Sequence, residues 1–325
     1  MKQVIILLGP TGVGKTGASI LLAKALDTEI ISADSMQIYR HMDIGTAKPS
    51  RAELGEVKHH MIDIAGPTEA YSTGLYIDAI VPVIENLHSL GKVPVITGGT
   101  GLYIKAITRG IFSGPSADWQ LRDELLLGEC ENPGSLYGRL VEADPEAARK
   151  IEQNDVRRII RGLEVCLKSS GTISGMQERL TSPLPYEFIK IGLTRDRNEL
   201  YTLIEQRVDA MVAAGLAAEV RNLLALQPDK TPMQAIGYKE MALHLAGGIS
   251  LEEAIRLIKR NTRRYAKRQF TWFRKEEGIQ WLDVTGLSDP GEILVKIMNV
   301  LDNSVQIIYG NKKINIQRGR GDVEQ

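Results

Sequence analysis

The strongest chemical pattern in the chain is a phosphate-binding loop of the form G-x-x-x-x-G-K-[ST]. It consists of Gly9, Pro10, Thr11, Gly12, Val13, Gly14, Lys15 and Thr16. In such loops the glycines let backbone N–H groups surround an oxyanion, and the following helix adds the positive end of its dipole. Lys15 is expected to reach the outer phosphate oxygens, and the Thr16 hydroxyl is expected to hold Mg²⁺. The pattern predicts a phosphorylated ligand without identifying it.

Two further polar residues follow predicted strands. Asp34 comes directly after the predicted strand 29–33, and Thr100 lies in a Gly-Gly-Thr-Gly turn after the predicted strand 92–97. A carboxylate in this position can act as a general base or bind Mg²⁺ beside the phosphate loop. A helix N-cap or a turn aspartate is the alternative without chemistry. The N–H and hydroxyl of Thr100 can contact a phosphate or leaving-group oxygen.

The elements that carry these residues alternate between strand and helix. The apolar run 4–8 precedes the phosphate loop, residues 18–26 follow it as a helix, and 75–87 suits a helix between the second and third strands. This alternation predicts an α/β fold, a P-loop-type parallel sheet flanked by helices, with ligands at the carboxyl ends of the strands. Asp34 and Thr100 would then lie at the same edge as the loop.

The alternation is interrupted by a helical segment. Residues 119–127 and 155–168 are charged and amphipathic, with no convincing strand between them, whereas 188–193 is strand-like again. This pattern predicts a helical insertion in a catalytic core, followed by a mobile polar tail. The expected ranges are 1–113 and 187–302 for the core, 114–186 for the insertion and 303–325 for the tail.

The densest positive charge lies on a predicted helix at 251–273. Lysine and arginine recur from Arg256 to Lys275 with no acid among them, although the formal net charge of the chain is zero. A helix face of one sign in a neutral chain favours a nucleic-acid phosphate footprint over an ordinary solvated face. The other face is mostly apolar and is expected to pack on the core. It comprises Ile258, Thr262, Tyr265, Gln269 and Trp272.

A second polar segment lies within the insertion, at Gln153, Asn154, Asp155, Val156, Arg157 and Arg158. Amides suit base edges and arginines suit phosphates. The same segment is also a good helix start, with Asp155 as its cap. The sequence supports the two interpretations equally.

Composition narrows the class of protein. The 325 residues are 43% hydrophobic and 25% charged, as in ordinary globular chains. The cysteines Cys130 and Cys166 have no metal-type spacing and give no sign of a disulfide framework. No apolar run approaches the roughly 20 residues of a membrane span, and no signal-peptide pattern is present. We expect a cytoplasmic monomer with no membrane association and no obligate protein partner.

Taken together, the motifs resemble those of a known family. The chain is similar to the bacterial tRNA dimethylallyltransferases, also called tRNA isopentenyltransferases, over roughly residues 1–300. The matching segments are the phosphate loop, Ser32–Tyr39, Met42–Pro49, Gly98–Tyr103, Gln153–Asp155 with Arg157 and Arg158, and Ala235–Glu240.

The resemblance implies a prenyl transfer rather than a phosphoryl transfer. Family members move a dimethylallyl group from dimethylallyl diphosphate to the exocyclic N6 amine of the adenine 3′ of the anticodon in tRNA. In this chain, the implied role of the phosphate loop is to hold the pyrophosphate, with Lys15 and a Mg²⁺ ion on Thr16 stabilising it as it leaves. Asp34 would act as general base toward the amine, and Thr100 would contact the bridging or leaving oxygen.

The implied partner is the tRNA anticodon stem-loop. An unpaired loop base leaves its stack more easily than a base in a duplex. The residues implied on the RNA side are Asp34, Ser35, Met36, Gln37, Thr100, Arg122, Gln153, Asn154, Asp155, Arg157, Arg158, Arg263 and Arg264.

One position departs from the family pattern. Some members have an arginine that contacts the diphosphate three residues before a Gly-Tyr pair, and this chain has Gln234 there. An amide can donate hydrogen bonds but supplies no charge. We assign Gln234 to diphosphate binding and expect another cation to compensate. Arg195 and Arg197 are the candidates by their place in the sequence.

Two other functions use the same loop. A small-molecule or nucleoside kinase would bind ATP there and use Asp34 as the base for a hydroxyl, but it has no need of a long basic helix. An ATP-dependent nucleic-acid-binding protein normally has an apolar strand that ends in an acid beside Mg²⁺. The strand at 93–97 ends in Gly-Gly instead, which disfavours that alternative.

Overall fold

The computed structural model describes residues 2–112, 114–115, 117–169 and 171–304. Over these residues, six strands form one parallel sheet in the order β3-β2-β4-β1-β5-β6. The predicted α/β class with a parallel sheet is confirmed. The strands are β1 (Gln3–Leu8), β2 (Ile30–Ala33), β3 (His59–His60), β4 (Val95–Gly98), β5 (Glu187–Thr194) and β6 (Ile279–Asp283).

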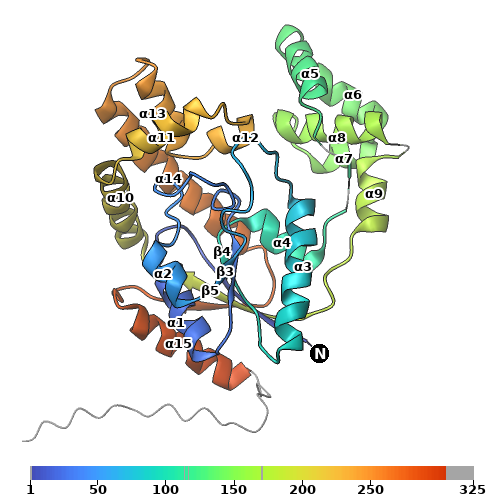
Figure 1. Cartoon of the computed structure of the whole chain (residues 1–325). Coiled ribbons are helices and arrows are strands. Elements are labelled where there is room, and N and C mark those ends of the chain that lie inside the picture. Colours follow the sequence, from blue (N-terminus) through green and yellow to red (C-terminus); the bar gives the residue numbers. More distant parts are fainter. Residues whose placement is uncertain (1, 113, 116, 170, 305–325) are drawn as a thin grey trace, which may run out of the picture.

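Helices cover both faces of the sheet (Figure 1). On one face, α1 (Lys15–Ala25) and α15 (Pro290–Ser304) pack against alternate residues of β1. On the other face, α3 (Thr73–Ser89) and α4 (Gly101–Arg109) pack against the remaining ones. Because successive side chains of a strand point to opposite faces, a strand covered on both sides must be apolar throughout. This explains the continuous apolar run that precedes the phosphate loop.

A second layer of helices lies over the carboxyl ends of the strands. These helices share an apolar cluster of their own with the loop that follows β2. The long helix α14 crosses from this layer to α4 and carries the basic run. The members are α10 (Arg197–Ala213), α11 (Leu216–Ala225), α12 (Lys230–Met233), α13 (Tyr238–Leu245) and α14 (Leu251–Phe273). The short helix α2 (Arg51–Glu56) precedes β3 in the chain.

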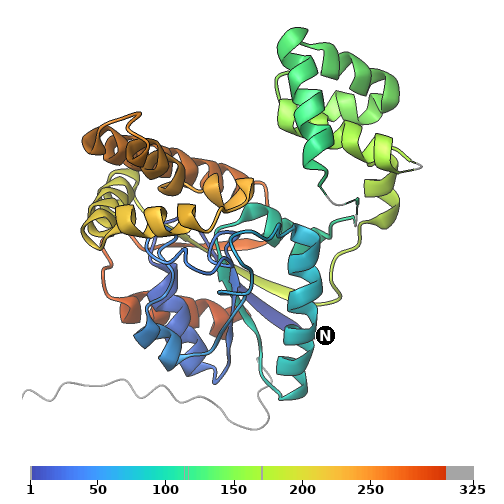
Figure 2. The same cartoon turned by 45° about the horizontal axis from the view of Figure 1, so that its top comes forward.

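Between α4 and β5 the chain forms a helical lobe that stands to one side of the sheet (Figure 2). Its helices enclose a separate apolar cluster that includes Leu140 and Leu163. One contact with the second layer is an ion pair between Asp123 and Lys230, with 2.7 Å between Oδ2 and Nζ. The helices of the lobe are α5 (Trp119–Glu131), α6 (Ser135–Ala143), α7 (Pro145–Lys150), α8 (Val156–Lys168) and α9 (Ile173–Leu180).

The structure adds elements that the sequence pattern did not reveal. The short strands β3 and β6 lie at the two edges of the sheet, where a strand can form without a regular pattern of apolar residues. Helix α1 begins at Lys15 rather than Ala18, so Lys15 and Thr16 belong to its first turn. Helix α15 ends at Ser304, and the rest of the expected tail, 305–325, lies outside the described residues. No helix in the described part of the chain is long and apolar enough to cross a membrane.

Candidate functional site

The phosphate loop connects the buried strand β1 to the first turn of α1. Gly14 precedes the helix with a φ of 109°, a conformation that glycine adopts without steric cost. The Lys15 ammonium donates hydrogen bonds to the carbonyl oxygens of Gly9 at 2.9 Å and Pro10 at 2.8 Å. The lysine is therefore folded back along its own loop.

The surroundings of Lys15 make it easy to deprotonate. Burial disfavours the ammonium and, with repulsion from Arg207, lowers its pKa to about 7, against a smaller opposing effect of Asp34. Burial also lowers the pKa of Arg207, but a guanidinium keeps its proton in proteins. Arg207 thus supplies a permanent positive charge beside a lysine that an anion would recharge, and the pocket that they share also contains the Asp34 carboxylate.

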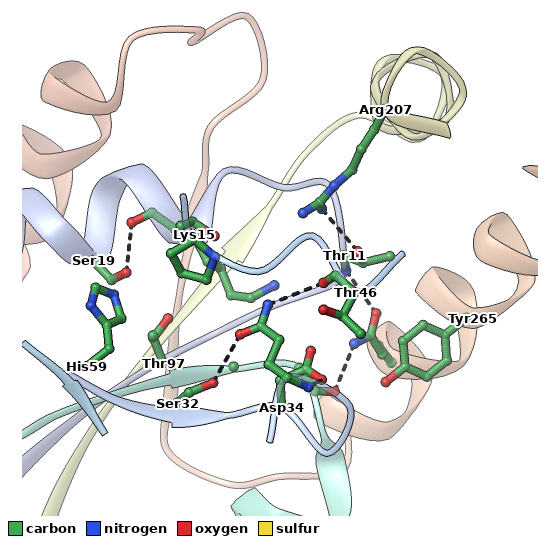
Figure 3. A pocket seen from close by; sticks show the side chains of 16 residues that line it. Thr11, Lys15, Ser19, Ser32, Asp34, Thr46, His59, Thr97, Arg207 and Tyr265 are labelled. Atoms are coloured by element: carbon green, nitrogen blue, oxygen red, sulfur yellow. Dashed lines mark hydrogen bonds between the residues drawn. The ribbon is translucent and has the colours of Figure 1, made fainter. Parts of the chain in front are cut away.

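Two adjoining cavities meet at this loop. The smaller one, of about 90 Å³, lies between the loop and the ends of β2 and β4, and the larger one, of about 370 Å³, extends between α10, α13 and α14. Figure 3 shows side chains of the loop, of α10 and of α14 around the smaller cavity. The residues that line both are Thr11, Asp34, Thr46, Arg207 and Tyr265.

Asp34 is held in place through one of its two carboxylate oxygens. Oδ1 accepts hydrogen bonds from the backbone N–H groups of Met36 at 2.9 Å and Gln37 at 3.3 Å. Among the described residues, none donates to Oδ2. The carboxylate is therefore oriented by its own turn, with one oxygen available to a ligand in the cavity.

Thr100 joins the second glycine turn to the segment that follows Asp34. Its hydroxyl oxygen accepts from the backbone N–H of Ser35 at 3.0 Å, and the Tyr265 hydroxyl interacts with the Thr100 side chain. Burial raises the pKa of Tyr265 above its ordinary value, so its hydroxyl remains protonated and able to donate. Thr100, Ser35 and Tyr265 thus form a polar group beside Asp34.

Gln37 and Met36 line the cavities from the same segment. The Gln37 amide donates to the carbonyl oxygens of Thr46 at 3.3 Å and Ala47 at 3.2 Å. These bonds connect the turn at Asp34 to a later part of the loop that follows β2. Glu219 of α11 holds that loop in turn, because its carboxylate accepts from three successive N–H groups, those of residues 43–45. The predicted set is thereby divided between the two adjoining cavities: Gln37 lines the smaller one, Ser35 and Met36 line the larger one, and Asp34 lines both.

Arg207 is a site residue that the sequence analysis missed. Its Nη1 lies 3.4 Å from the Thr11 hydroxyl, and its side chain lines both cavities. Neither of the two expected compensating cations lines either cavity. Arg195 pairs with Glu199 and donates to the Leu287 carbonyl, and Arg197 donates to the Tyr201 hydroxyl. The cation that accompanies Lys15 comes from the middle of α10.

Gln234 lines the larger cavity and not the smaller one. It lies at the end of α12, where its backbone N–H bonds to the carbonyl of Thr231. Gln234 is exposed, and it does not line the cavity that contains Lys15 and Thr16. Arg157, from the start of α8, lines the same cavity, so the helical lobe contributes to its wall.

The other predicted RNA-binding residues divide into exposed and paired groups. Gln153, Asn154 and Arg158 are exposed next to Arg157, and Asp155 caps α8 through the N–H of Arg158 at 3.2 Å. The helix-start interpretation of this segment is therefore correct, and the cap leaves the neighbouring side chains free to meet a ligand.

Arg122, Arg263 and Arg264 differ in their surroundings. Arg122 forms two hydrogen bonds, of 2.9 and 2.7 Å, with the fully buried carboxylate of Glu164. Arg263 pairs with Glu205 of α10, whereas Arg264 is exposed. The two neighbouring arginines of α14 thus do not form one surface, and acids from other elements neutralise part of the basic run.

The mostly apolar stripe of α14, on the other face from its basic run, forms part of the wall of the site. Ile258 and Gln269 are buried, and Thr262 and Tyr265 line the larger cavity. Trp272 is 42% exposed and covers the turn at Gly101, where a Cβ atom would meet its ring. The expectation that this face packs on the core is therefore correct only in part, because Thr262 and Tyr265 line a cavity instead.

Comparison with known proteins identifies the family. A family model described as IPP transferase matches residues 37–276. The chain belongs to the IPP transferase family. The tRNA dimethylallyltransferase of Thermodesulfovibrio yellowstonii is 55% identical over 307 residues, which cover 92% of this chain and 98% of that protein. The enzyme of the same name from Syntrophobacter fumaroxidans is 49% identical, covering 86% and 83% of the two chains.

Solved structures agree with this assignment. The tRNA isopentenylpyrophosphate transferase of Bacillus halodurans is 41% identical with a TM-score of 0.69, covering 93% of this chain and 96% of that one. A eukaryotic dimethylallyltransferase whose structure is described as acting on tRNA has a TM-score of 0.79 at 29% identity, covering 93% and 79% of the two chains. The predicted family and enzyme class, a tRNA-modifying prenyltransferase, are confirmed. Membership of this family excludes the kinase and the ATP-dependent binding protein as descriptions of the chain.

Proposed function

We propose that this chain transfers a dimethylallyl group from dimethylallyl diphosphate to the N6 amine of the adenine 3′ of the anticodon in tRNA. The observation that carries the proposal is the joint lining of one cavity by Lys15, Arg207 and Asp34. Two cations at a phosphate loop suit a diphosphate, and a carboxylate next to them suits an attacking amine. The donor and the acceptor would meet between them.

The diphosphate would lie on the N-terminal turn of α1. Loop N–H groups, the Lys15 ammonium and the Arg207 guanidinium would bind its oxygens, and the Thr11 hydroxyl adjoins Arg207. The backbone N–H of Thr11 is already bonded to Gln269, and the side chain of Val13 is buried in the core. Thr11 would therefore bind the diphosphate only through its hydroxyl, and Val13 only through its backbone.

The donor set of the smaller cavity fits a Mg²⁺ ion that arrives with the diphosphate. Thr16, Ser32 and Thr97 line it with hydroxyls, and the buried Thr97 hydroxyl has no hydrogen-bond partner among the described residues. The described residues hold no group of three metal-binding side chains. Mg²⁺ commonly takes one or two protein ligands and completes its shell with phosphates and water, so Thr16 would be its ligand. When bound, the ion would stabilise charge on the leaving pyrophosphate.

Asp34 would prepare the acceptor. As the adenine N6 forms a bond to C1 of the donor, the bond between C1 and the bridging oxygen breaks and pyrophosphate leaves. The proton lost from N6 would pass to Oδ2 of Asp34, the oxygen that the protein leaves free. Thr100, held against Ser35, would lie close to the bridging oxygen. Lys15 and Arg207 would balance the negative charge as it grows.

The larger cavity would accommodate the uncharged parts of the ligands. Ile204, Val208 and Met211 line it along one stripe of α10 that also contains Arg207. A helix stripe that combines one cation with apolar side chains suits a molecule with a diphosphate head and a hydrocarbon tail. Gln234 would contact the ligand in this cavity.

The RNA partner would be the anticodon stem-loop. The exposed residues Gln153, Asn154, Arg157 and Arg158 at the start of α8, and Arg264 on α14, would bind its backbone and loop bases. The chain would act as a monomer in the cytoplasm, where its tRNA substrate is found.

The proposal is tested with labelled dimethylallyl diphosphate, Mg²⁺ and an anticodon stem-loop. We expect label to transfer to RNA with adenine 3′ of the anticodon and not to the same RNA with guanine there, which lacks an N6 amine. Replacement of the donor by ATP tests phosphoryl transfer in the same reaction. Phosphate transfer or ATP hydrolysis without prenylation would contradict the proposal.

A further inference from the structure

One buried side chain connects the two loops that would hold the donor and the acceptor. The Oε1 of Gln269 accepts from the backbone N–H of Thr11 in the phosphate loop at 2.9 Å. Its Nε2 donates to the carbonyl oxygen of Gly99 in the second glycine turn at 2.8 Å. Gln269 is only 6% exposed, so water does not compete for these bonds. Among the described residues, no other side chain hydrogen-bonds to both loops.

The glycine turn lies tightly against the helix that carries this glutamine. A Cβ atom at Gly99 would collide with Nε2 of Gln269, and one at Gly101 would collide with the ring of Trp272. A side chain at either glycine would therefore displace Gln269 or Trp272, or move the turn away from α14. Since Gln269 and Trp272 lie almost one turn apart, the turn is fixed at two points along the helix.

The two bonds join the donor side of the site to the acceptor side. Thr11 lies in the phosphate loop and adjoins Arg207. Gly99 directly precedes Thr100, whose hydroxyl accepts from Ser35 N–H next to Asp34. A displacement of either loop would therefore change the separation between the diphosphate and the base that receives the adenine.

We infer that Gln269 is a positioning residue that sets this separation, an inference that rests on the proposed function. Its bond to Thr11 uses an N–H that the diphosphate then does not use, so donor binding leaves the connection intact. An amide is suited to this role because it donates and accepts at once. A carboxylate would keep only the acceptor and place a second oxygen against the Gly99 carbonyl.

The test separates donor binding from transfer. The variant Gln269→Met keeps the length of the side chain and removes both hydrogen bonds. Pyrophosphate affinity is measured by calorimetry with Mg²⁺, and transfer to the stem-loop is measured in a single turnover. We expect affinity close to that of the unaltered chain and transfer slower by roughly 10- to 100-fold, because small misalignments of reacting groups are costly.

A second readout reports alignment directly. When the acceptor is misplaced, water can attack C1 of the donor instead, so that pyrophosphate leaves and dimethylallyl alcohol forms with loss of a proton to solvent. The ratio of this alcohol to prenylated RNA should rise in Gln269→Met and also in Gln269→Glu. The control is Phe273→Leu, which loosens a fully buried side chain of the same helix and should leave the ratio unchanged.

The result that overturns the inference is equally specific. Unchanged transfer in Gln269→Met, or an equal loss of pyrophosphate affinity and transfer, would show that Gln269 does not align the two sites. A rise of the ratio in Phe273→Leu would show that general loosening is enough. Failure of the proposed function would appear differently, as a lack of transfer by the unaltered chain.

Discussion

The Arg207 guanidinium lies 3.4 Å from the Thr11 hydroxyl, although 196 residues separate the two in sequence. This contact brings a permanent positive charge from α10 to the phosphate loop. The loop's own lysine bonds to two carbonyl groups, whereas the Arg207 guanidinium bonds to this one hydroxyl among the described residues, so we expect its remaining N–H groups to meet an incoming diphosphate. We expect Arg207 to supply the positive charge that Gln234 lacks.

Replacement of Arg207 by glutamine should weaken donor binding. A hydrogen bond to a charged group contributes about 1.5–3 kcal/mol, which corresponds to a loss of affinity of roughly 10- to 100-fold. Calorimetric titration with pyrophosphate and Mg²⁺ measures it. Arg197→Gln on the same helix is the matched control, since Arg197 donates to Tyr201. Equal losses in the two variants would indicate a general effect of charge instead of a contact.

Replacement of Asp34 by asparagine should slow transfer and leave donor binding nearly unchanged. Asparagine keeps an oxygen for the N–H groups of Met36 and Gln37, so the turn survives, but it cannot take a proton. We expect a loss of roughly 10²-fold or more in single-turnover transfer. A large loss of pyrophosphate affinity would instead assign Asp34 to Mg²⁺ binding.

Donor binding should depend on pH through Lys15. Its pKa in the unliganded pocket is lowered to about 7, so above that pH the free chain carries a neutral amine. A bound diphosphate favours the ammonium and raises its pKa, and binding must then take up a proton. Affinity for pyrophosphate should therefore fall as pH rises through 7.

Proton uptake is measured by titrating pyrophosphate at about pH 8 in buffers of different ionisation enthalpy. Pyrophosphate itself exchanges protons, so the relevant quantity is the difference between the unaltered chain and Lys15→Met. We expect that difference to be a net uptake by the unaltered chain. The same uptake in both proteins would show that Lys15 does not change its charge on binding.

Charge changes on α14 should separate its two neighbouring arginines. Arg264 is exposed, so Arg264→Gln should weaken stem-loop binding and reduce the slope of log affinity against log salt by about one. Arg263 is already paired with Glu205, and Arg263→Gln should leave the slope nearly unchanged. Equal slope changes in both would mean that the pair with Glu205 opens when RNA binds.

Arg122 should act mainly through the stability of the helical lobe. Its two hydrogen bonds to the buried Glu164 make Arg122→Met destabilising by about 1–3 kcal/mol. Hydrogen exchange in α5 and α8 reports this loss, and the exposed Arg139 provides the control Arg139→Met. Weaker RNA binding with unchanged exchange would instead place Arg122 in direct contact with RNA.

The sequence reveals those parts of the site that are local in the chain. The phosphate loop has a fixed spacing between an apolar strand and a helix, and Asp34 and Thr100 follow strands. Because a parallel sheet brings the ends of its strands together, their proximity could be predicted from these patterns. The fold class could be predicted for the same reason, since buried strands are continuously apolar.

The parts that come from helices could not be identified in this way. Arg207 is one of many charged residues on α10, and its neighbour Thr11 lies far away in sequence. Gln269 gave a weak signal, as an amide on a mostly apolar helix stripe. Arg263 was placed with Arg264 because helical spacing is local, whereas the acid that pairs with it belongs to α10. Such partners become visible only when the helices are packed.

The central place of β1 in the sheet has a consequence for the order of synthesis. Its partners β4 and β5 end at residues 98 and 194, and β5 follows the helical lobe in sequence. The lobe, with its own apolar cluster, can leave the ribosome and fold before β1 has its second neighbour. Arg207, Tyr265 and Gln269 emerge later still. The phosphate loop is therefore synthesised early, but the site is complete only after α14 has been made.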